Sequence, residues 1–266
     1  MYPSRDYHTY TNYHLEPAGL TRLDFFMDAI EVWSRAHPGV TPAILDVGCG
    51  NGNIALPLAS KGWWVDGIDT DAQSIAAVNE RNVFPTLHVA VADIETWKPE
   101  RTYDVILVSE FLEHVADPGR VLAKAATMLT SGGLLIGSVP NGWSLEEGLR
   151  RLLQRTGSGR NMKRGLRSTI LPHEIVQSHA ESPHVQYFSW GRLHPLVRDA
   201  GFVVRERVSS SIFFHGLYYI VGRFCMTRGS RLFHFLDAID TFLAPYFPRW
   251  MGEGWLFACA KRNSKS

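Results

Sequence analysis

Short apolar runs alternate with stretches of helical spacing between Thr41 and Val139. The runs are rich in β-branched residues, and the stretches between them place apolar residues three and four positions apart. This alternation is typical of a parallel sheet whose strands are joined by crossover helices. The pattern predicts strands at Ala43–Val47, Trp63–Ile68, Thr86–Val91, Tyr103–Val108 and Leu134–Val139.

One crossover helix is predicted after the fourth of these strands. Asp117 is suited to cap its first turn and Pro118 to occupy its first position, while Gly132 and Gly133 are expected to end it. Its apolar positions fall on one face: Val121, Leu122, Ala125, Met128 and Leu129. The segment is therefore predicted to be an amphipathic crossover helix.

Further elements are predicted on both sides of this region. Residues Leu20–Ala36 have the spacing of a helix, and a second helix ends at Gly201, with Pro195 expected to kink it. Phe202–Val208 and Gly254–Ala260 are predicted to be strands.

The chain divides into three predicted parts. Residues 1–40 form an N-terminal arm and helix, residues 41–210 form a core, and residues 211–266 form an aromatic helical cap with a final strand. The core carries an insertion at 141–187. Between 148 and 173 this insertion has seven arginine and lysine residues and no aspartate or glutamate, which predicts a basic loop.

Composition excludes several classes of protein. Of the 266 residues, 45% are apolar and 20% charged, which excludes a disordered, highly charged tail. The formal net charge of +1 gives no overall attraction to nucleic acid or membrane, and we expect no DNA partner. Three cysteines without metal-site spacing argue against a zinc site and for a reducing compartment.

No segment has the pattern of a secretory signal or a membrane span. The first residues lack a basic start followed by an apolar run, and Ile212–Met226 is interrupted by His215 and Arg223. We expect a cytoplasmic protein. Peripheral membrane contact through residues 150–167 and 211–250 is the membrane role that stays open.

The clearest chemical signal is a glycine-rich loop after the first predicted strand. Gly48, Gly50 and Gly52 alternate there, as expected where backbone must approach a nucleoside cofactor closely. Asn53 occupies the position of the third glycine in the dinucleotide pattern G-x-G-x-x-G. Asp46 precedes the loop, where a carboxylate would disfavour a pyrophosphate but balance a cationic group.

Two further carboxylates follow the next two predicted strands. Asp69 is placed to accept hydrogen bonds from both ribose hydroxyls, and Asp93 to accept one from an adenine amino group. Together with Asp46, they lie at three successive strand ends. A tight strand-to-helix turn without a ligand would explain the glycines alone, but it would not explain the three carboxylates.

These motifs resemble those of the class I S-adenosylmethionine-dependent methyltransferases, and within them the group of ubiquinone-biosynthesis O-methyltransferases. The resemblance covers roughly residues 43–208 and is carried by Leu45–Gly52, Gly67–Asp69, Tyr103–Ile106, Ser109–Val115, Leu134–Asn141 and Phe188–Phe202. It implies a doubly wound, mostly parallel, seven-stranded Rossmann-like α/β sheet with an antiparallel last strand. Gly254–Ala260 should then insert beside Phe202–Val208.

The resemblance also implies S-adenosylmethionine as cofactor and a small molecule, hydrophobic or anionic, as methyl acceptor on oxygen. The expected cofactor-binding residues are Asp46, Gly48, Cys49, Gly50, Gly52, Asn53, Asp69, Thr70, Asp93, Ile94 and Ser109. Cys49 is interpreted as a small buried residue and not as a reactive thiol. Methyl transfer from a sulfonium requires alignment, exclusion of water and, for a protonated acceptor, a base.

Glu110, Glu113 and His114 form a dense acid and base cluster after the fourth predicted strand. In the group that the sequence resembles, the matching positions are associated with a divalent metal such as Mg²⁺. The three residues are therefore candidate catalytic residues and candidate metal ligands. Two other interpretations stay open: His114 acts alone as base, or Glu110 caps, Glu113 faces solvent and His114 lines the cofactor cleft.

Side chains outside these motifs could complete the site. Three histidines flank the basic insertion: His173, His179 and His184. Three tyrosines of the N-terminal arm could close over the cofactor or simply pack on the first helix: Tyr7, Tyr10 and Tyr13. The aromatic segment 211–250 is predicted to cap the substrate mouth, with an interfacial anchor or plain core as alternatives.

The leading hypothesis is a small-molecule O-methyltransferase. An RNA 2′-O-methyltransferase is the nearest alternative, and the neutral charge balance counts against it. An NAD-dependent oxidoreductase of Rossmann type is disfavoured by Asn53, and a cofactor-binding domain without catalysis is a third possibility. The sequence leaves the acceptor and the oligomeric state open.

Overall fold

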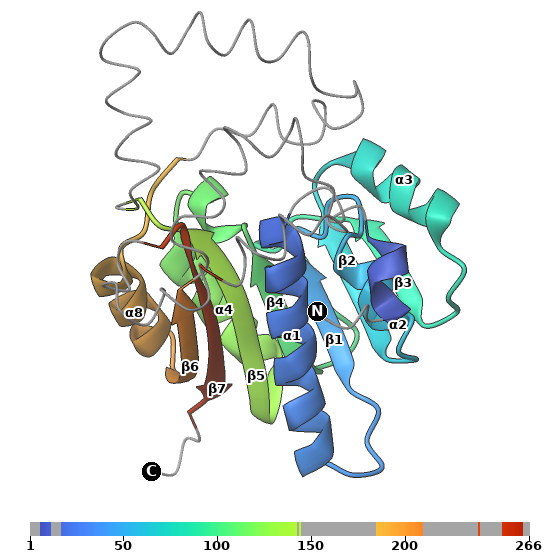
Figure 1. Cartoon of the computed structure of the whole chain (residues 1–266), viewed down its shortest axis with the longest axis horizontal. Coiled ribbons are helices and arrows are strands. Elements are labelled where there is room, and N and C mark those ends of the chain that lie inside the picture. Colours follow the sequence, from blue (N-terminus) through green and yellow to red (C-terminus); the bar gives the residue numbers. More distant parts are fainter. Residues whose placement is uncertain are drawn as a thin grey trace, which may run out of the picture.

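A computed structural model shows a single seven-stranded sheet covered by helices (Figure 1). It describes residues 6–11, 17–142, 144, 185–209, 239 and 252–262. The strand order is β3-β2-β1-β4-β5-β7-β6. The predicted doubly wound, mostly parallel sheet is therefore confirmed.

The elements have the following bounds. The strands are β1 Ala43–Val47, β2 Trp64–Asp69, β3 Leu87–Val91, β4 Tyr103–Ser109, β5 Leu129–Pro140, β6 Phe202–Ser209 and β7 Gly254–Lys261. The helices are α1 Pro17–Ala36, α2 Ala55–Ala59, α3 Ala72–Arg81, α4 Pro118–Met128 and α8 Trp190–Asp199. Two short 3₁₀ helices are η1 Asp6–Tyr10 and η3 Leu112–His114.

The last strand, β7, lies between β5 and β6 and runs antiparallel to both, as predicted. In β7, Cys259 pairs with Leu135 of β5 on one side and with Val204 of β6 on the other. β1 to β5 pair in parallel, so their carboxyl ends meet at one edge of the sheet. Ligands bind at this edge in open α/β sheets.

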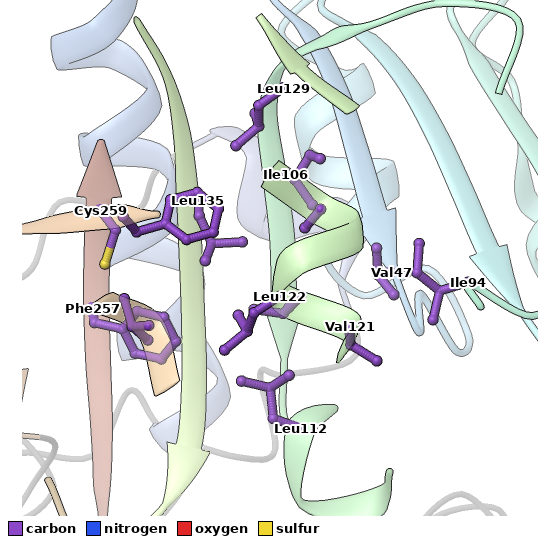
Figure 2. Packing of buried hydrophobic residues seen from close by; sticks show 14 of the residues in the cluster. Val47, Ile94, Ile106, Leu112, Val121, Leu122, Leu129, Leu135, Phe257 and Cys259 are labelled. Atoms are coloured by element: carbon purple, nitrogen blue, oxygen red, sulfur yellow. The ribbon is translucent and has the colours of Figure 1, made fainter. Parts of the chain in front are cut away.

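Two buried apolar clusters fill the two faces of the sheet. Successive residues of β4 point to opposite faces of the sheet. Val105 belongs to the cluster with α1 and α2, and Ile106 belongs to the cluster with α4 and α8. Figure 2 shows the second cluster, in which Leu122 of α4 lies over the strands near Leu135 and Phe257. Burial on both faces explains why the strands read as continuous apolar runs.

The crossover helix α4 begins as predicted but ends earlier. Asp117 accepts a hydrogen bond from Arg120 N at 3.0 Å, and Pro118 starts the helix. Leu129, which was predicted on the apolar face of the helix, is instead the first residue of β5, where it pairs with Tyr103. The predicted end at the glycines was wrong because this pairing draws the chain into the sheet before Gly132 is reached.

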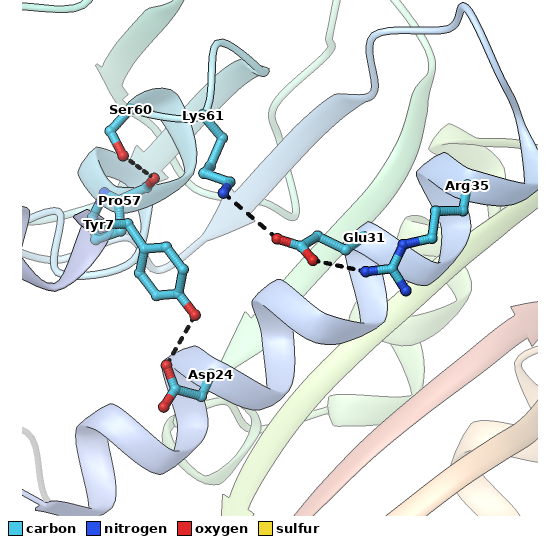
Figure 3. Close-up of polar contacts among 7 residues, drawn as sticks. All are labelled: Tyr7, Asp24, Glu31, Arg35, Pro57, Ser60 and Lys61. Atoms are coloured by element: carbon cyan, nitrogen blue, oxygen red, sulfur yellow. Dashed lines mark hydrogen bonds and ion pairs between the residues drawn. The ribbon is translucent and has the colours of Figure 1, made fainter. Parts of the chain in front are cut away.

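The N-terminal segment packs on the first helix. Tyr7 of η1 is buried, and its hydroxyl donates to Asp24 Oδ1 of α1 at 3.0 Å (Figure 3). Nearby, Glu31 of α1 pairs with Lys61 at 3.5 Å and with Arg35 at 3.1 Å. For Tyr7, packing on the first helix is therefore confirmed.

Several predictions fall outside the described residues. They are the basic loop from Arg150 to Arg167, the histidines at 173, 179 and 184, Tyr13, and the aromatic segment 211–250 apart from Ile239. Among the described helices, none has the length and apolar character needed to cross a bilayer. Helix α8 continues through Pro195 to Asp199.

Candidate active site

The glycine-rich loop leaves β1 and turns back toward β2. The amides of Gly48 and Cys49 both donate to Ile68 O of β2, at 2.8 and 3.0 Å. Gly48, Gly50 and Gly52 all have positive φ, at 72°, 48° and 72°, which glycine adopts without strain. At Gly48 a β-carbon would lie 2.5 Å from Phe111 Cδ2, so a larger residue would collide with the chain after β4.

Asp46 lies at the base of this loop as a buried carboxylate. It is only 1% exposed, and neither carboxyl oxygen has a hydrogen-bond partner within the described parts of the chain. Burial, and to a smaller extent the nearby charge of Asp69, raise its pKa to about 7. A buried carboxylate without partners is costly, so its position indicates a ligand that supplies donors or positive charge.

Asp69 connects the second strand to the glycine-rich loop. Its Oδ2 accepts from Gly50 N at 2.8 Å, and its Oδ1 accepts from Asp71 N at 2.9 Å. Each carboxylate oxygen can accept a further hydrogen bond. The side chain therefore fixes the loop and retains acceptor capacity for a ligand.

The remaining predicted cofactor positions differ in exposure. Asp93 is exposed and accepts from Glu95 N through Oδ1 at 2.8 Å, while Thr70 is also exposed. Ile94 and Cys49 are buried. Burial raises the pKa of the Cys49 thiol above its ordinary value, which agrees with its interpretation as an unreactive buried residue.

The chain after β4 is strained at Glu110. Glu110 has a φ of 49°, the one positive value for a non-glycine residue within the described ranges. Its amide donates to Ser138 O at 3.0 Å and to Ser138 Oγ at 3.1 Å, and Ser109 Oγ lies 3.3 Å from the same hydroxyl. These contacts with β5 hold the backbone in the strained conformation, which is common at functional sites.

Glu113 is the second buried carboxyl of the site. It is 1% exposed, and no hydrogen-bond partner for its carboxyl oxygens occurs in the part of the chain that the structure describes. Its pKa is raised to about 9, mainly by burial and also by the charge of Glu110, while a backbone hydrogen bond and Arg22 act in the opposite direction. The interpretation in which Glu113 faces solvent is therefore wrong.

The Glu113 backbone is also tied to a distant segment. Its carbonyl accepts from Val185 N at 2.9 Å and from Gln186 N at 3.3 Å, and Gln186 Nε2 donates to Val115 O at 2.7 Å. The segment that follows the insertion thus fixes η3 beside the sheet edge. His114 Nε2 lies 3.8 Å from Glu113 Oε1, and the imidazole is partly exposed.

We expect Glu113→Gln to change how stability depends on pH. A carboxyl whose pKa is raised by folding gives stability that is complete below about 4.5 and is lost as the pH rises through about 9. The glutamine variant has no such proton to lose. In urea denaturation at several pH values, its free energy of unfolding relative to wild type should rise by about 1.4 kcal/mol per pH unit within this window.

A constant difference between the two proteins across that pH range would contradict a raised pKa at Glu113. The matched control is Glu95→Gln, because Glu95 is more exposed and pairs with Arg120 at 3.2 Å. That variant should leave the slope unchanged.

The three predicted metal ligands do not form a metal site in this structure. Within the described ranges, no group of three or more His, Cys, Asp or Glu side chains is arranged to hold a metal ion. Glu110 Oε1 lies 3.6 Å from the guanidinium of Arg22, so one of the three predicted ligands is paired with a cation of the protein. A metal at these three residues stays a prediction.

Three further residues of the site had no motif in the sequence. Arg22 comes from α1, Ser138 from β5, and Gln186 from the segment before α8. Each reaches the site through long-range packing. Of these three residues, only Ser138 had a local signal in the sequence, because it is a polar residue within the mostly apolar fifth strand.

The structure thus brings the predicted residues together in two neighbouring groups. Asp46, the glycine-rich loop and Asp69 form one group, and Glu110, Glu113 and His114 form the other with Arg22. Phe111 lies between them, because its ring is packed over Gly48.

Comparison with known proteins places this site in a family. Residues 25–207 match the family described as methyltransferase domain. The ubiquinone biosynthesis O-methyltransferase of Caulobacter sp. strain K31 is 33% identical over 124 residues, which cover 43% of this chain and 49% of the relative. The protein of the same name from Burkholderia pseudomallei strain 1710b is 29% identical over 183 residues, covering 65% and 70%.

The chain spans about half or less of the length of the first curated relatives that it matches. Solved structures share the fold at low identity. A SAM-dependent methyltransferase from Thermotoga maritima has a TM-score of 0.55 at 16% identity, covering 96% of this chain and 92% of that one. The N-methyltransferase NodS from Bradyrhizobium japonicum WM9 has 0.52 at 15%, covering 95% and 98%.

The family match covers well over half of the chain and, apart from Arg22, both groups of site residues. It confirms the resemblance to class I methyltransferases that the glycine-rich loop and the strand-end carboxylates indicated. The chain belongs to the methyltransferase domain family.

Proposed function

We propose that the protein binds S-adenosylmethionine and transfers its methyl group to an oxygen atom of a small molecule. The observation that carries the proposal is the buried carboxylate of Asp46, which has no hydrogen-bond partner among the described residues and lies directly before a loop of three positive-φ glycines. The family match and the names of the curated relatives support it.

The bound cofactor supplies a methyl group on a positively charged sulfur, with a neutral sulfide as leaving group. In the proposal, Asp46 balances the positive charge of this ligand, Asp69 accepts from the ribose hydroxyls, and Asp93 accepts from the adenine amino group. The glycines allow the backbone to approach the nucleoside. This assignment explains why the described part of the chain offers Asp46 no hydrogen-bond partner.

For the transfer itself, we propose that His114 acts as the base that removes the proton of the acceptor hydroxyl. The imidazole is partly exposed at the edge of the sheet where ligands bind, so an acceptor oxygen can reach it. Glu113, protonated at neutral pH, and the strained backbone at Glu110 would position η3 and exclude water.

Oxygen as the acceptor atom is supported by the curated relatives, which are named O-methyltransferases. The test is incubation with S-adenosylmethionine that carries a labelled methyl group, together with protocatechuic acid as a phenolic acceptor or with total RNA. We expect label in the phenol and none in the RNA. Label in RNA alone would favour the RNA methyltransferase, and label in neither with no cofactor binding would overturn the proposal.

Asp69→Ala is expected to weaken cofactor binding. The loss should be about 1.5–3 kcal/mol, the usual range for hydrogen bonds to a charged group, because the carboxylate serves both the loop and the ribose. Isothermal titration calorimetry with S-adenosylhomocysteine measures it. Asp117→Ala is the control: it removes the hydrogen bond by which Asp117 caps α4, and should lower stability without changing affinity. Unchanged affinity in Asp69→Ala would remove Asp69 from the ribose site.

A further inference from the structure

One arginine connects the glycine-rich loop to the N-terminal segment. Arg81, the last residue of α3, donates from Nη1 to Asn51 O at 3.0 Å and from Nη2 to Tyr10 O at 3.1 Å. Asn51 lies in the middle of the loop, and Tyr10 ends η1. A single planar guanidinium thus fixes the distance between these two segments.

The guanidinium is engaged by backbone and not by charge. Arg81 is partly buried, and burial lowers its pKa, with no charged neighbour in the described residues that counteracts this shift. Such a cation is satisfied only while both carbonyls stay in place. Displacement of either segment would therefore leave a partly desolvated donor without its acceptor.

η1 also packs on α2, the helix that follows the loop, and on α1. η1 is anchored to α1 through Asp24, which accepts from Tyr7 Oη at 3.0 Å and lies 2.6 Å from His8 Nε2. The ring of Tyr10 packs edge-on against Phe84 at 5.0 Å. The loop is held at Gly50 by Asp69. The side chain of Arg81 donates hydrogen bonds to both segments at once.

We propose that Arg81 is a positioning residue that couples docking of η1 to the conformation of the glycine-rich loop. The proposal rests on the function proposed above, since it takes the loop to be the cofactor site. A ligand that fixes the backbone at Asn51 would also fix the carbonyl of Tyr10, because the same guanidinium binds both. By linkage, a cofactor that binds the ordered loop stabilises the docked segment, and the docked segment raises cofactor affinity by the same factor.

The first measurement is the affinity for S-adenosylhomocysteine, by calorimetry, in wild type, Arg81→Met, Arg81→Lys and Arg35→Met. We expect Arg81→Met to bind roughly 5-fold or more weakly, at the lower end of known coupling between sites. Lysine keeps the positive charge but lacks the planar pair of donors that reaches two carbonyls. Arg81→Lys should therefore bind S-adenosylhomocysteine with an affinity between those of Arg81→Met and wild type. Arg35 pairs with Glu31 on exposed α1 surface, and its variant should match wild type.

The second measurement is hydrogen exchange of the peptide that contains residues 6–11, with and without S-adenosylhomocysteine. We expect the ligand to protect this peptide in wild type and in Arg35→Met, and to lose that effect in Arg81→Met. A purely structural role of Arg81 would lower the melting temperature but leave the ligand-dependent protection intact.

The outcomes separate the two proposals. Wild type that binds S-adenosylhomocysteine while Arg81→Met binds equally well and keeps the protection would overturn the coupling alone. Wild type that does not bind would overturn the proposed function and the coupling with it. If Arg81→Met fails to fold, Arg81→Lys decides: affinity and protection equal to wild type in that variant would also overturn the coupling.

Discussion

Asp46→Asn should weaken binding of S-adenosylmethionine by about tenfold or more. The carboxylate is buried under the glycine-rich loop, and no residue that the structure describes forms a hydrogen bond with it, so a positively charged ligand would supply a counter-charge. A charged hydrogen bond contributes about 1.5–3 kcal/mol, and 1.4 kcal/mol corresponds to a factor of ten in the dissociation constant. Titration calorimetry at pH 8 measures the loss.

The same carboxyl predicts a pH dependence of binding. Because the pKa of Asp46 is about 7 in the free protein, the carboxyl is protonated below that pH and must lose its proton before it can balance a cation. The dissociation constant of wild type should therefore rise as the pH falls below about 7 and level off above it. The asparagine variant should bind weakly at every pH, without this dependence.

Stability should change in the opposite direction. A carboxyl whose pKa is raised by folding contributes stability that is complete below about 3.8 and is lost as the pH rises through about 7. Without cofactor, Asp46→Asn should therefore gain stability over wild type as the pH rises between these values. Asp104→Asn is a suitable control, since Asp104 accepts from Ala43 N at 3.1 Å at the other end of the sheet. Tight, pH-independent binding by Asp46→Asn would remove Asp46 from the cofactor site.

The strands could be predicted because they are buried on both faces. Each parallel strand reads as a short β-branched run, and the predicted β1 agrees with the structure at both ends. The start of β5 could not be predicted, because it depends on pairing between Leu129 and Tyr103 across the sheet. A helix end that is decided by such a distant partner leaves no local signal.

The cofactor loop was equally accessible to sequence analysis. Glycines at alternate positions and an aspartate at each strand end are local patterns that follow from the geometry of a strand-to-helix turn. The burial of Glu113 was not accessible, since it follows from the packing of η3 under residues 185 and 186 after the insertion. Contacts of Arg22 and Arg81 depend on how α1 and α3 pack, and no spacing encodes them.

His114→Gln should lower the turnover number by about 10²–10⁴-fold, the range expected when a general base is removed. The phenol of an acceptor such as protocatechuic acid is protonated at neutral pH, and its oxygen becomes a good nucleophile only as the proton leaves. The glutamine side chain keeps hydrogen-bonding capacity but cannot accept that proton. Rates of methyl transfer at saturating cofactor and acceptor measure the change.

The affinity for S-adenosylhomocysteine should stay within about twofold of wild type in this variant, since removing the base changes the chemical step and not cofactor binding. His37→Gln is the matched control, because His37 stacks on Trp33 at the far end of α1 and should retain full turnover. Rescue of the His114 variant at high pH, where the phenol ionises in solution, would support the role as base. Unchanged turnover at neutral pH would show that the acceptor loses its proton without His114, and the base would then have to be sought outside η3.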